Sequence, residues 1–259
     1  MRTQPEQQAP PVQRLRIRYA KRGRLRFTSH RDFSRAFERA LVRARVPMAY
    51  SSGFNPHPRI SYAGASPTGA ASEAEYLEIG LAAVVEPEEV RRVLDEALPP
   101  GLDVLEVVVS GGGSLTERLE ASHWRIRLPD VAVERLSEAV ERFLGTAEVP
   151  VERMTKKGLR SFDARAAVLA LAAAPEVGIA GETGDERPPD ARYAILDAVL
   201  RHGTPSVRPD DILAGLRGIA GLEAGAAAVS QRVAQGPFDP RDGTVGDPLA
   251  PDRDAAGGG

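Results

Sequence analysis

The sequence predicts an α+β protein built from two tandem ferredoxin-like units, each with the element order β-α-β-β-α-β, between disordered termini. Segments that alternate apolar and polar residues are interleaved with segments of helical period. This pattern occurs twice, over residues 14–109 and again over residues 122–235. Between the copies, residues 110–121 begin with Ser-Gly-Gly-Gly-Ser, a composition typical of a flexible linker.

The first unit opens with a predicted strand over 14–20, where Leu15, Ile17 and Tyr19 alternate with arginines. Residues 24–27 are expected to extend the sheet briefly. A helix follows, capped by Ser29 and ended by Pro47. Its apolar residues fall at helical spacing and predict one buried stripe: Phe33, Ala36, Phe37, Ala40, Leu41 and Ala44.

The remaining elements complete each unit in the same order. In the first unit we expect strands over 48–52, 59–64 and 74–82, a helix over 87–98 and a closing strand over 102–109. In the second unit we expect strands over 123–128, 149–155 and 191–200 and helices over 131–144 and 208–219. Residues 159–173 fit a strand or a helix equally well.

Both termini are predicted to be disordered tails. Residues 1–13 and 236–259 are rich in Pro, Gly or Asp and show no apolar period, so they offer little surface to bury against the entropy of the chain. The first residues also lack the apolar core of a secretory signal, and no apolar run approaches about 18 residues. These features predict a soluble, cytoplasmic protein without a membrane partner.

Composition excludes several kinds of site. The chain contains no cysteine, which excludes disulfides, zinc sites of the cysteine type and an iron–sulfur cluster held by this protein's own thiolates. No phosphate-binding glycine loop and no histidine or carboxylate spacing typical of a metal site occurs. We therefore expect no metal and no cofactor in this chain.

Charge is distributed unevenly along the sequence. Residues 14–59 contain thirteen Lys and Arg but only Asp32 and Glu38, a net charge of +11 in a chain whose total is −2. Such separation indicates a polyanionic or acidic partner for the first unit, although an arginine-rich surface balanced by acidic neighbours would show the same pattern.

The segment Tyr-Ser-Ser-Gly-Phe-Asn-Pro-His-Pro at 50–58 is the most unusual stretch. Its two prolines make the backbone stiff and extended, which predicts that Asn55 and His57 face a ligand. Arginines for phosphates and exposed aromatic faces for bases are what recognition of single-stranded RNA requires. The candidate ligand- or RNA-binding residues are Arg24, Arg26, Ser29, His30, Arg31, Arg35, Tyr50, Ser51, Phe54, Asn55, His57, Arg59, Lys156 and Lys157.

Two other functions remain open. His30 and His57 could act as general acid and base in a metal-independent ribonuclease or an RNA-modifying enzyme, with arginines stabilising the charge of the transition state. Alternatively, the basic half could dock on an acidic protein surface without nucleic acid. Tyr50 and Phe54 could also be core residues of the sheet, as most aromatic residues are.

The segments "SHRDF", "ERAL" and "AYSSGFNPHP", with the later "MTKKGLRSFD", resemble the radical-SAM-linked protein family, also described as DUF2344, over about residues 14–235. The resemblance implies an accessory or substrate-presenting role beside a separate radical SAM protein, in RNA or ribosome-related modification. That partner would carry the iron–sulfur cluster and S-adenosylmethionine. The matching positions are Ser29, His30, Asp32, Tyr50, Ser51, Gly53, Phe54, Asn55, Pro56, His57, Pro58, Lys156, Lys157, Gly158 and Asp163.

Overall fold

The computed structural model describes residues 7–155, 158–175, 193–224 and 227–257. The chain forms two compact units, each with its own hydrophobic core. Unit 1 comprises the residues up to Thr68, Ser72–Arg118 and Asp247–Gly259, and unit 2 comprises Gly69–Ala71 and Leu119–Gly246. The described part of the chain is therefore a mixed α+β protein, as the sequence predicts.

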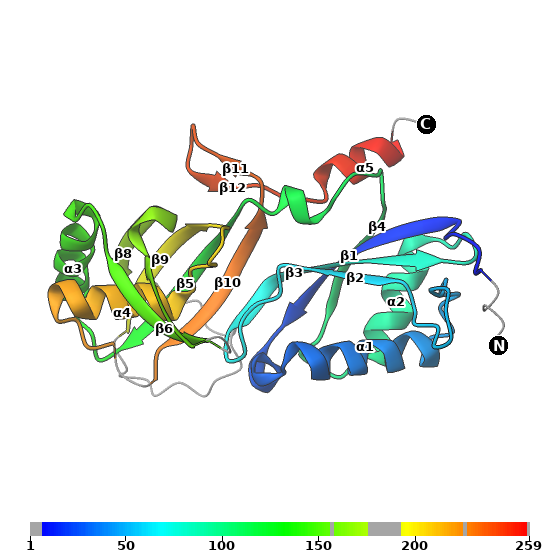
Figure 1. Cartoon of the computed structure of the whole chain (residues 1–259), viewed down its shortest axis with the longest axis horizontal. Helices are drawn as coiled ribbons and strands as arrows, with labels where there is room; N and C mark the ends of the chain where they lie inside the picture. Colours follow the sequence, from blue (N-terminus) through cyan, green and yellow to red (C-terminus); the bar gives the residue numbers. More distant parts are fainter. Residues whose placement is uncertain (1–6, 156–157, 176–192, 225–226, 258–259) are drawn as a thin grey trace. The chain divides into compact units, whose positions relative to one another are not determined.

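Unit 1 is an antiparallel sheet with two helices on one side of its strands (Figure 1). The strand order is β4-β1-β3-β2. Its elements are β1 (Gln13–Lys21), a 3-10 helix η1 (Gly23–Phe27), α1 (His30–Arg43), β2 (Ile60–Ala63), β3 (Ala71–Leu81), α2 (Pro87–Ala97), β4 (Val104–Val109), a 3-10 helix η2 (Thr116–Arg118) and α5 (Ala250–Gly257).

The core of unit 1 is formed by the apolar residues that alternate along its strands and by those at helical spacing in its helices. Leu15 and Ile17 of β1 pair with Ile79 and Leu77 of β3, and all four side chains are buried. The apolar stripe of α1, which includes Phe37, packs into the same cluster together with the inner side of α2. The alternate residues of β1 point away from this core, and Arg16 is one of them.

The segment 236–259, expected to be a disordered tail, is instead built into the fold through residue 257. Residues 238–245 form a small hairpin in unit 2, and α5 returns to unit 1, where it lies on the opposite side of the strands from α1 and α2 (Figure 1). Leu249 is fully buried there. The buried Leu249 and the ion pairs of Asp252 and Arg253 with residues of unit 1 hold a segment whose composition alone argues for disorder.

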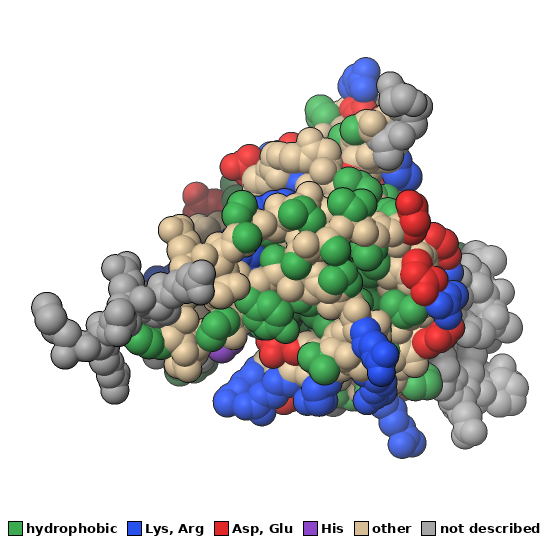
Figure 2. Space-filling view, turned by 90° about the vertical axis from the view of Figure 1, so that its right-hand side faces the viewer, with side chains coloured by type: hydrophobic (Ala, Val, Ile, Leu, Met, Phe, Trp, Pro, Cys, Tyr) green, Lys and Arg blue, Asp and Glu red, His purple; other side chains and the backbone are tan. Residues whose placement is uncertain are grey.

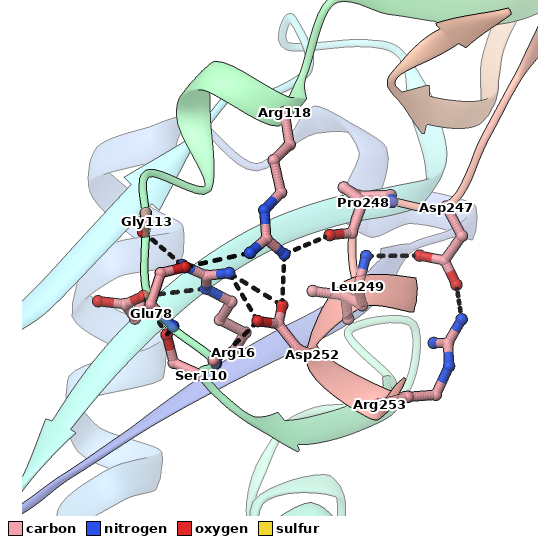
Figure 3. Close-up of polar contacts among 12 residues, drawn as sticks. Arg16, Glu78, Ser110, Gly113, Arg118, Asp247, Pro248, Leu249, Asp252 and Arg253 are labelled. Carbon is pink, nitrogen blue, oxygen red and sulfur yellow. Dashed lines mark hydrogen bonds and ion pairs between the residues drawn. The ribbon is translucent and has the colours of Figure 1, made fainter. Parts of the chain in front are cut away.

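The fully buried guanidinium of Arg16 holds α5 in place (Figure 3). It donates to both carboxylate oxygens of Asp252 at 2.9 Å, and Arg118 donates to the same carboxylate at 2.7 Å. Arg16 also donates to the carbonyl oxygens of Gly112 and Gly113. The predicted linker is therefore fastened to unit 1 as far as Arg118, and the boundary between the units follows that residue.

Unit 2 also consists of an antiparallel sheet and two helices, with additional hairpins. Its antiparallel sheet has the order β10-β5-β9-β8, and β6 and β7 form a separate two-stranded hairpin. The elements are β5 (Ala121–Pro129), α3 (Val133–Gly145), β6 (Pro150–Thr155), β7 (Gly158–Asp163), a 3-10 helix η3 (Arg165–Ala167), β8 (Val168–Pro175), β9 (Tyr193–Arg201), α4 (Pro209–Ala220), β10 (Val229–Gly236), β11 (Phe238–Asp239) and β12 (Thr244–Val245).

Several local expectations need correction. Residues 24–27 form part of η1 and not a strand extension. Residues 48–52 make only isolated bridges, Met48 with Leu81 and Tyr50 with Pro58. The ambiguous segment 159–173 forms strands joined by η3, and β10 was not anticipated. Among the described helices, none is long and apolar enough to cross a membrane.

Candidate functional site

The start of α1 is organised by its cap. The Ser29 hydroxyl oxygen accepts a hydrogen bond from the Asp32 backbone N–H at 3.2 Å and lies 2.7 Å from the Asp32 carboxylate, which accepts from it. The exposed His30 ring meets the Tyr62 ring edge-on, with 4.9 Å between the centroids. His30 is thus positioned by an aromatic contact with β2.

A row of arginines follows on the exposed side of α1. Arg31, Arg35 and Arg39 are exposed, and residues four apart lie on one face, about 6 Å apart along the axis. Within the described residues, none of the three takes part in an ion pair. By contrast, Arg91 and Arg92 of α2 are paired with glutamates of their own helix. The α1 row therefore carries positive charge that the described fold does not neutralise.

The 3-10 helix before α1 adds to this surface. Arg24 is exposed, and the Arg26 guanidinium lies over the Phe27 ring, 4.7 Å from its centroid. Phe27 itself is an exposed aromatic ring. An arginine stacked on an exposed ring presents both a cation and a flat apolar face to solvent.

The loop over residues 51–57 is closed at its neck. Ser51 N–H donates to the His57 carbonyl oxygen at 2.8 Å, and His57 N–H donates back to the Ser51 hydroxyl at 3.0 Å. Between them, the side chains of Phe54, Asn55 and His57 are exposed, and Phe54 is 66% exposed. The aromatic ring at the tip is therefore available to a ligand and does not belong to the core.

The base of the loop is fastened to β3. Arg59 N–H donates to the Ala49 carbonyl oxygen, and the Arg59 side chain donates to the Tyr50 carbonyl oxygen at 3.1 Å. Gly80 allows this packing, because a Cβ there would lie 2.7 Å from Pro11 and 3.3 Å from Arg59. Residues 7–12, which were assigned to a disordered tail, thus run beside the loop.

A half-open groove of about 310 Å³ separates the end of α1 from the base of this loop. The 40% exposed ring of Tyr50 belongs to it. Its lining residues are Glu38, Leu41, Val42, Arg45, Val46, Met48, Tyr50 and Pro58.

The backbone of Arg45 is unusual. Its φ of 53° lies in the left-handed region, which glycine normally occupies at the end of a helix. Val46 N–H donates to the Leu41 carbonyl and Arg45 N–H to the Val42 carbonyl, both at 3.1 Å, the hydrogen-bond pattern of a Schellman motif. A charged residue therefore occupies a strained position beside the groove.

Glu38 is the one acidic residue that lines the groove. Within the described structure it is exposed and makes no hydrogen bond or ion pair. Burial raises the pKa of the nearby Tyr62 hydroxyl, and the negative charge of Glu38 raises it further against the opposing effect of Ser34. The phenol of Tyr62 therefore stays neutral, and Glu38 contributes an uncompensated negative charge to a basic surface.

The end of unit 1 that carries the loop also exposes apolar side chains. Figure 2 shows hydrophobic side chains gathered in the middle of this face, with basic side chains along its lower edge. Val12 and Val84 are 61% and 74% exposed. We call the hydrophobic side chains that Figure 2 shows there the apolar end face. The exposed large hydrophobic residues of unit 1 include Val12, Val42, Tyr50, Phe54 and Val84.

The two candidate catalytic histidines belong to different elements. His30 lies at the first residue of α1, whereas His57 precedes Pro58, which lines the groove together with Val42. His30 and Val42 are separated by about 18 Å along the helix axis. Lys156 and Lys157 lie outside the described residues.

Sequence analysis missed two groove residues. Glu38 is visible in the sequence only as the single acid between Arg35 and Arg39. Arg45 could have been noticed as the residue between the end of the helix and Pro47, where a glycine is usual. In the described residues, no cluster of three or more His, Cys, Asp or Glu side chains is arranged to hold a metal ion.

Comparison with known families adds one finding. The model of DUF2344, described as an uncharacterized protein conserved in bacteria, matches residues 14–209, which is most of the chain. Among proteins with curated descriptions, none matches. The matched residues include the whole arginine row, the loop and the groove. The chain therefore belongs to the DUF2344 family.

Proposed function

We propose that each unit is a ferredoxin-like β-α-β-β-α-β unit, the second with an inserted hairpin. Numbered within each unit's sheet, the strands of both follow the order fourth, first, third, second. The helices of unit 1 follow its first and third sheet strands, as that topology requires. In unit 2, β6 and β7 form a hairpin of their own and are the insertion.

We propose that the protein binds single-stranded or looped RNA through unit 1 and acts as a non-catalytic accessory protein. One observation carries this proposal: a row of arginines without acidic partners leads along α1 toward a rigid loop with exposed aromatic rings. Arginines neutralise phosphates, and aromatic faces stack on unpaired bases.

Physical chemistry favours this use of the loop over a purely structural role. An exposed aromatic ring contributes little to folding, because the hydrophobic gain comes from removing apolar surface from water. Holding Phe54 in solvent in a loop that two following prolines stiffen and that the Ser51–His57 hydrogen bonds close instead reduces the entropy lost when a ligand stacks on it.

The arginine row can be tested separately from the ring. In the Arg31→Gln/Arg35→Gln variant, we expect binding of a 12-nucleotide single-stranded RNA to weaken. The slope of the logarithm of the affinity against the logarithm of the salt concentration should become shallower by about 1.4, since each phosphate contact on a single strand contributes about 0.7.

The exposed ring of the loop is tested by a second variant. Phe54→Ala should weaken binding by about 1–3 kcal/mol with an unchanged salt slope, because it removes a stacking face and no charge. Fluorescence anisotropy at four salt concentrations measures both effects.

The matched control is Arg91→Gln/Arg92→Gln on α2, which removes the same charge from two arginines of the same unit that are already paired. We expect its affinity and salt slope to match those of the unmodified protein. If the two double variants lose affinity equally, binding follows overall charge and not the α1 row. If no variant and no unmodified protein binds RNA, the proposed function is wrong.

A second candidate function is docking on a protein without nucleic acid, and the apolar end face favours it. Val12 and Val84 expose apolar side chains, which fit a protein partner better than a phosphate backbone. The partner implied by the resemblance, a radical SAM protein that carries the iron–sulfur cluster and S-adenosylmethionine, stays a prediction. Its retention by the chain after nuclease treatment, without RNA, would favour docking.

The enzymatic alternative receives less support. Acid–base cleavage of one phosphodiester needs both imidazoles within hydrogen-bond reach of the same group. His30 is the first residue of α1, whereas His57 is next to Pro58, which lines the groove with Val42 near the other end of that helix, so this arrangement gives the alternative little support.

A further inference from the structure

We infer that the groove between α1 and the loop receives a guanine base of the bound RNA, with the Glu38 carboxylate accepting hydrogen bonds from its Watson–Crick edge. This inference rests on the proposed RNA binding and specifies which base that site recognises. It begins from the groove lining, where a single acid faces a space also bordered by an aromatic ring and an arginine.

The position of Glu38 is unfavourable for RNA binding in general. A carboxylate beside Arg35 and Arg39 repels the phosphates that those arginines attract, so it weakens non-specific binding to any RNA. Asp32, the other acid of the basic segment, is accounted for by its hydrogen bonds with Ser29 at the start of α1. Glu38 makes no hydrogen bond or ion pair in the described structure, so its two oxygens are available to accept hydrogen bonds from a ligand.

The groove has the size and walls of a site for one planar base. Its volume of about 310 Å³ lies at the lower end of the range for small-ligand pockets. Val42, Met48 and Pro58 supply apolar walls, and the exposed Tyr50 ring supplies a stacking face. Arg45, on the same groove, provides a cation for the phosphate next to the bound base.

The chemistry of the carboxylate selects the base. An ionised carboxylate only accepts hydrogen bonds, and its two oxygens can accept two parallel ones. Guanine alone presents two adjacent donors, N1–H and the N2 amino group, on its Watson–Crick edge. Adenine and cytosine have a ring nitrogen acceptor beside their amino group, and uracil has carbonyl oxygens on both sides of its one N–H. With each of these bases, one carboxylate oxygen would therefore face another acceptor and not a donor.

Four 12-nucleotide RNAs test the inference: an all-uridine strand and three strands that carry one central guanosine, adenosine or inosine. We expect the unmodified protein to bind the guanosine strand about tenfold or more tighter than the uridine or adenosine strand, as for a bidentate base contact. Inosine lacks the N2 amino group and should lose a large part of that preference. One guanosine per strand avoids association between strands.

Glu38→Gln is the decisive variant, because its amide replaces one acceptor by a donor, which would face one of the two donors on the guanine edge. We expect its preference for guanosine to disappear while its affinity for the uridine strand is kept or increased. Glu86→Gln removes an equal charge from an exposed position of unit 1 outside the groove and should keep the preference.

The outcomes separate the two proposals. Binding of all four strands with equal affinity, or a guanosine preference that survives in Glu38→Gln, overturns the guanine site and leaves RNA binding in place. Absence of binding to every strand overturns the proposed function, and the guanine site with it. A preference lost equally in Glu86→Gln would mean that overall charge, and not the groove, is responsible.

Discussion

At the scale of single residues, Arg45 shows how the site departs from what folding alone favours. A non-glycine residue in the left-handed region costs about 1–2 kcal/mol, and the Schellman hydrogen bonds at the end of α1 are compatible with glycine. Strain of this kind persists where the surrounding structure imposes it, often at ligand sites. The strained residue here also lines the groove.

Arg45→Gly therefore has opposite expected effects on stability and on binding. Relief of about 1–2 kcal/mol of backbone strain exceeds the added entropy of the unfolded chain, about 0.4–1 kcal/mol, so the free energy of unfolding should rise by up to about 1.6 kcal/mol. Affinity for the guanosine strand should fall because a cation is lost. Urea unfolding and anisotropy measure the two effects, and a variant that is less stable, or that binds equally well, would contradict this account.

At this scale the stiffness of the loop can be predicted from the sequence, whereas the groove cannot. The stiffness of residues 54–58 follows from two prolines, which act on their immediate neighbours. The importance of Glu38 depends on which side chains lie near it after folding, and Tyr50 and Pro58 come from another element. No local pattern records that proximity.

At the scale of elements, α5 depends on its docking. Eight residues are too few for a stable isolated helix, and among the described side chains of residues 247–255 the most deeply buried are those of Leu249 and Asp252. The docking contact is the ion pair of Asp252 with Arg16, reinforced by Arg118 and by the Gly111 N–H. Removing one partner of a buried ion pair strongly lowers the free energy of unfolding, because the other charge stays buried without its partner.

Asp252→Asn should accordingly destabilise unit 1. We expect a loss of about 3 kcal/mol, near the lower end of the range for breaking a buried pair, since Glu78 still accepts from Arg16 at 3.0 Å. Asp254→Asn, an exposed residue of the same helix, is the control and should change stability by less than about 0.5 kcal/mol. Equal effects of the two substitutions in urea unfolding would refute the role of the pair.

Because of the same pair, the difference in free energy of unfolding between the unmodified protein and Asp252→Asn should depend on pH. Burial raises the pKa of Asp252, but hydrogen bonds from Gly111, Arg16 and Arg118 outweigh it and hold the pKa below its usual value. A carboxyl with a lowered folded pKa stabilises the protein above its unfolded pKa of about 3.9 and loses that contribution as the pH falls through the folded pKa. The advantage over Asp252→Asn should be constant near neutral pH and shrink below about pH 4.

At the scale of the whole molecule, the chain leaves unit 1 at Arg118, builds unit 2 and returns to unit 1 at Asp247. Each unit has its own buried cluster, one gathered around Phe37 and Leu94 and the other around Phe143 and Leu216. The C-terminal segment therefore contributes to the stability of the unit that is distant from it in sequence.

Deletion of residues 247–259 tests this organisation. We expect faster amide hydrogen exchange in β1 and β4, which lose the contacts of Leu249 and Asp252, and little change in β5 and β9. A deletion of residues 254–259 keeps both side chains and should leave exchange in β1 unchanged. Faster exchange in β9 alone would show that the segment stabilises the other unit.

The sequence by itself determined the α+β class, most helices and strands and the stiff loop, because periodicity, capping and proline geometry act between near neighbours. The docking of α5, the groove and the charges left without partners on α1 were decided by tertiary structure. Arg16 and Asp252 are 236 residues apart in sequence, and their pairing turns a segment with the composition of a disordered tail into part of unit 1. Contacts of this kind depend on the folded positions of both residues, which neither local segment encodes.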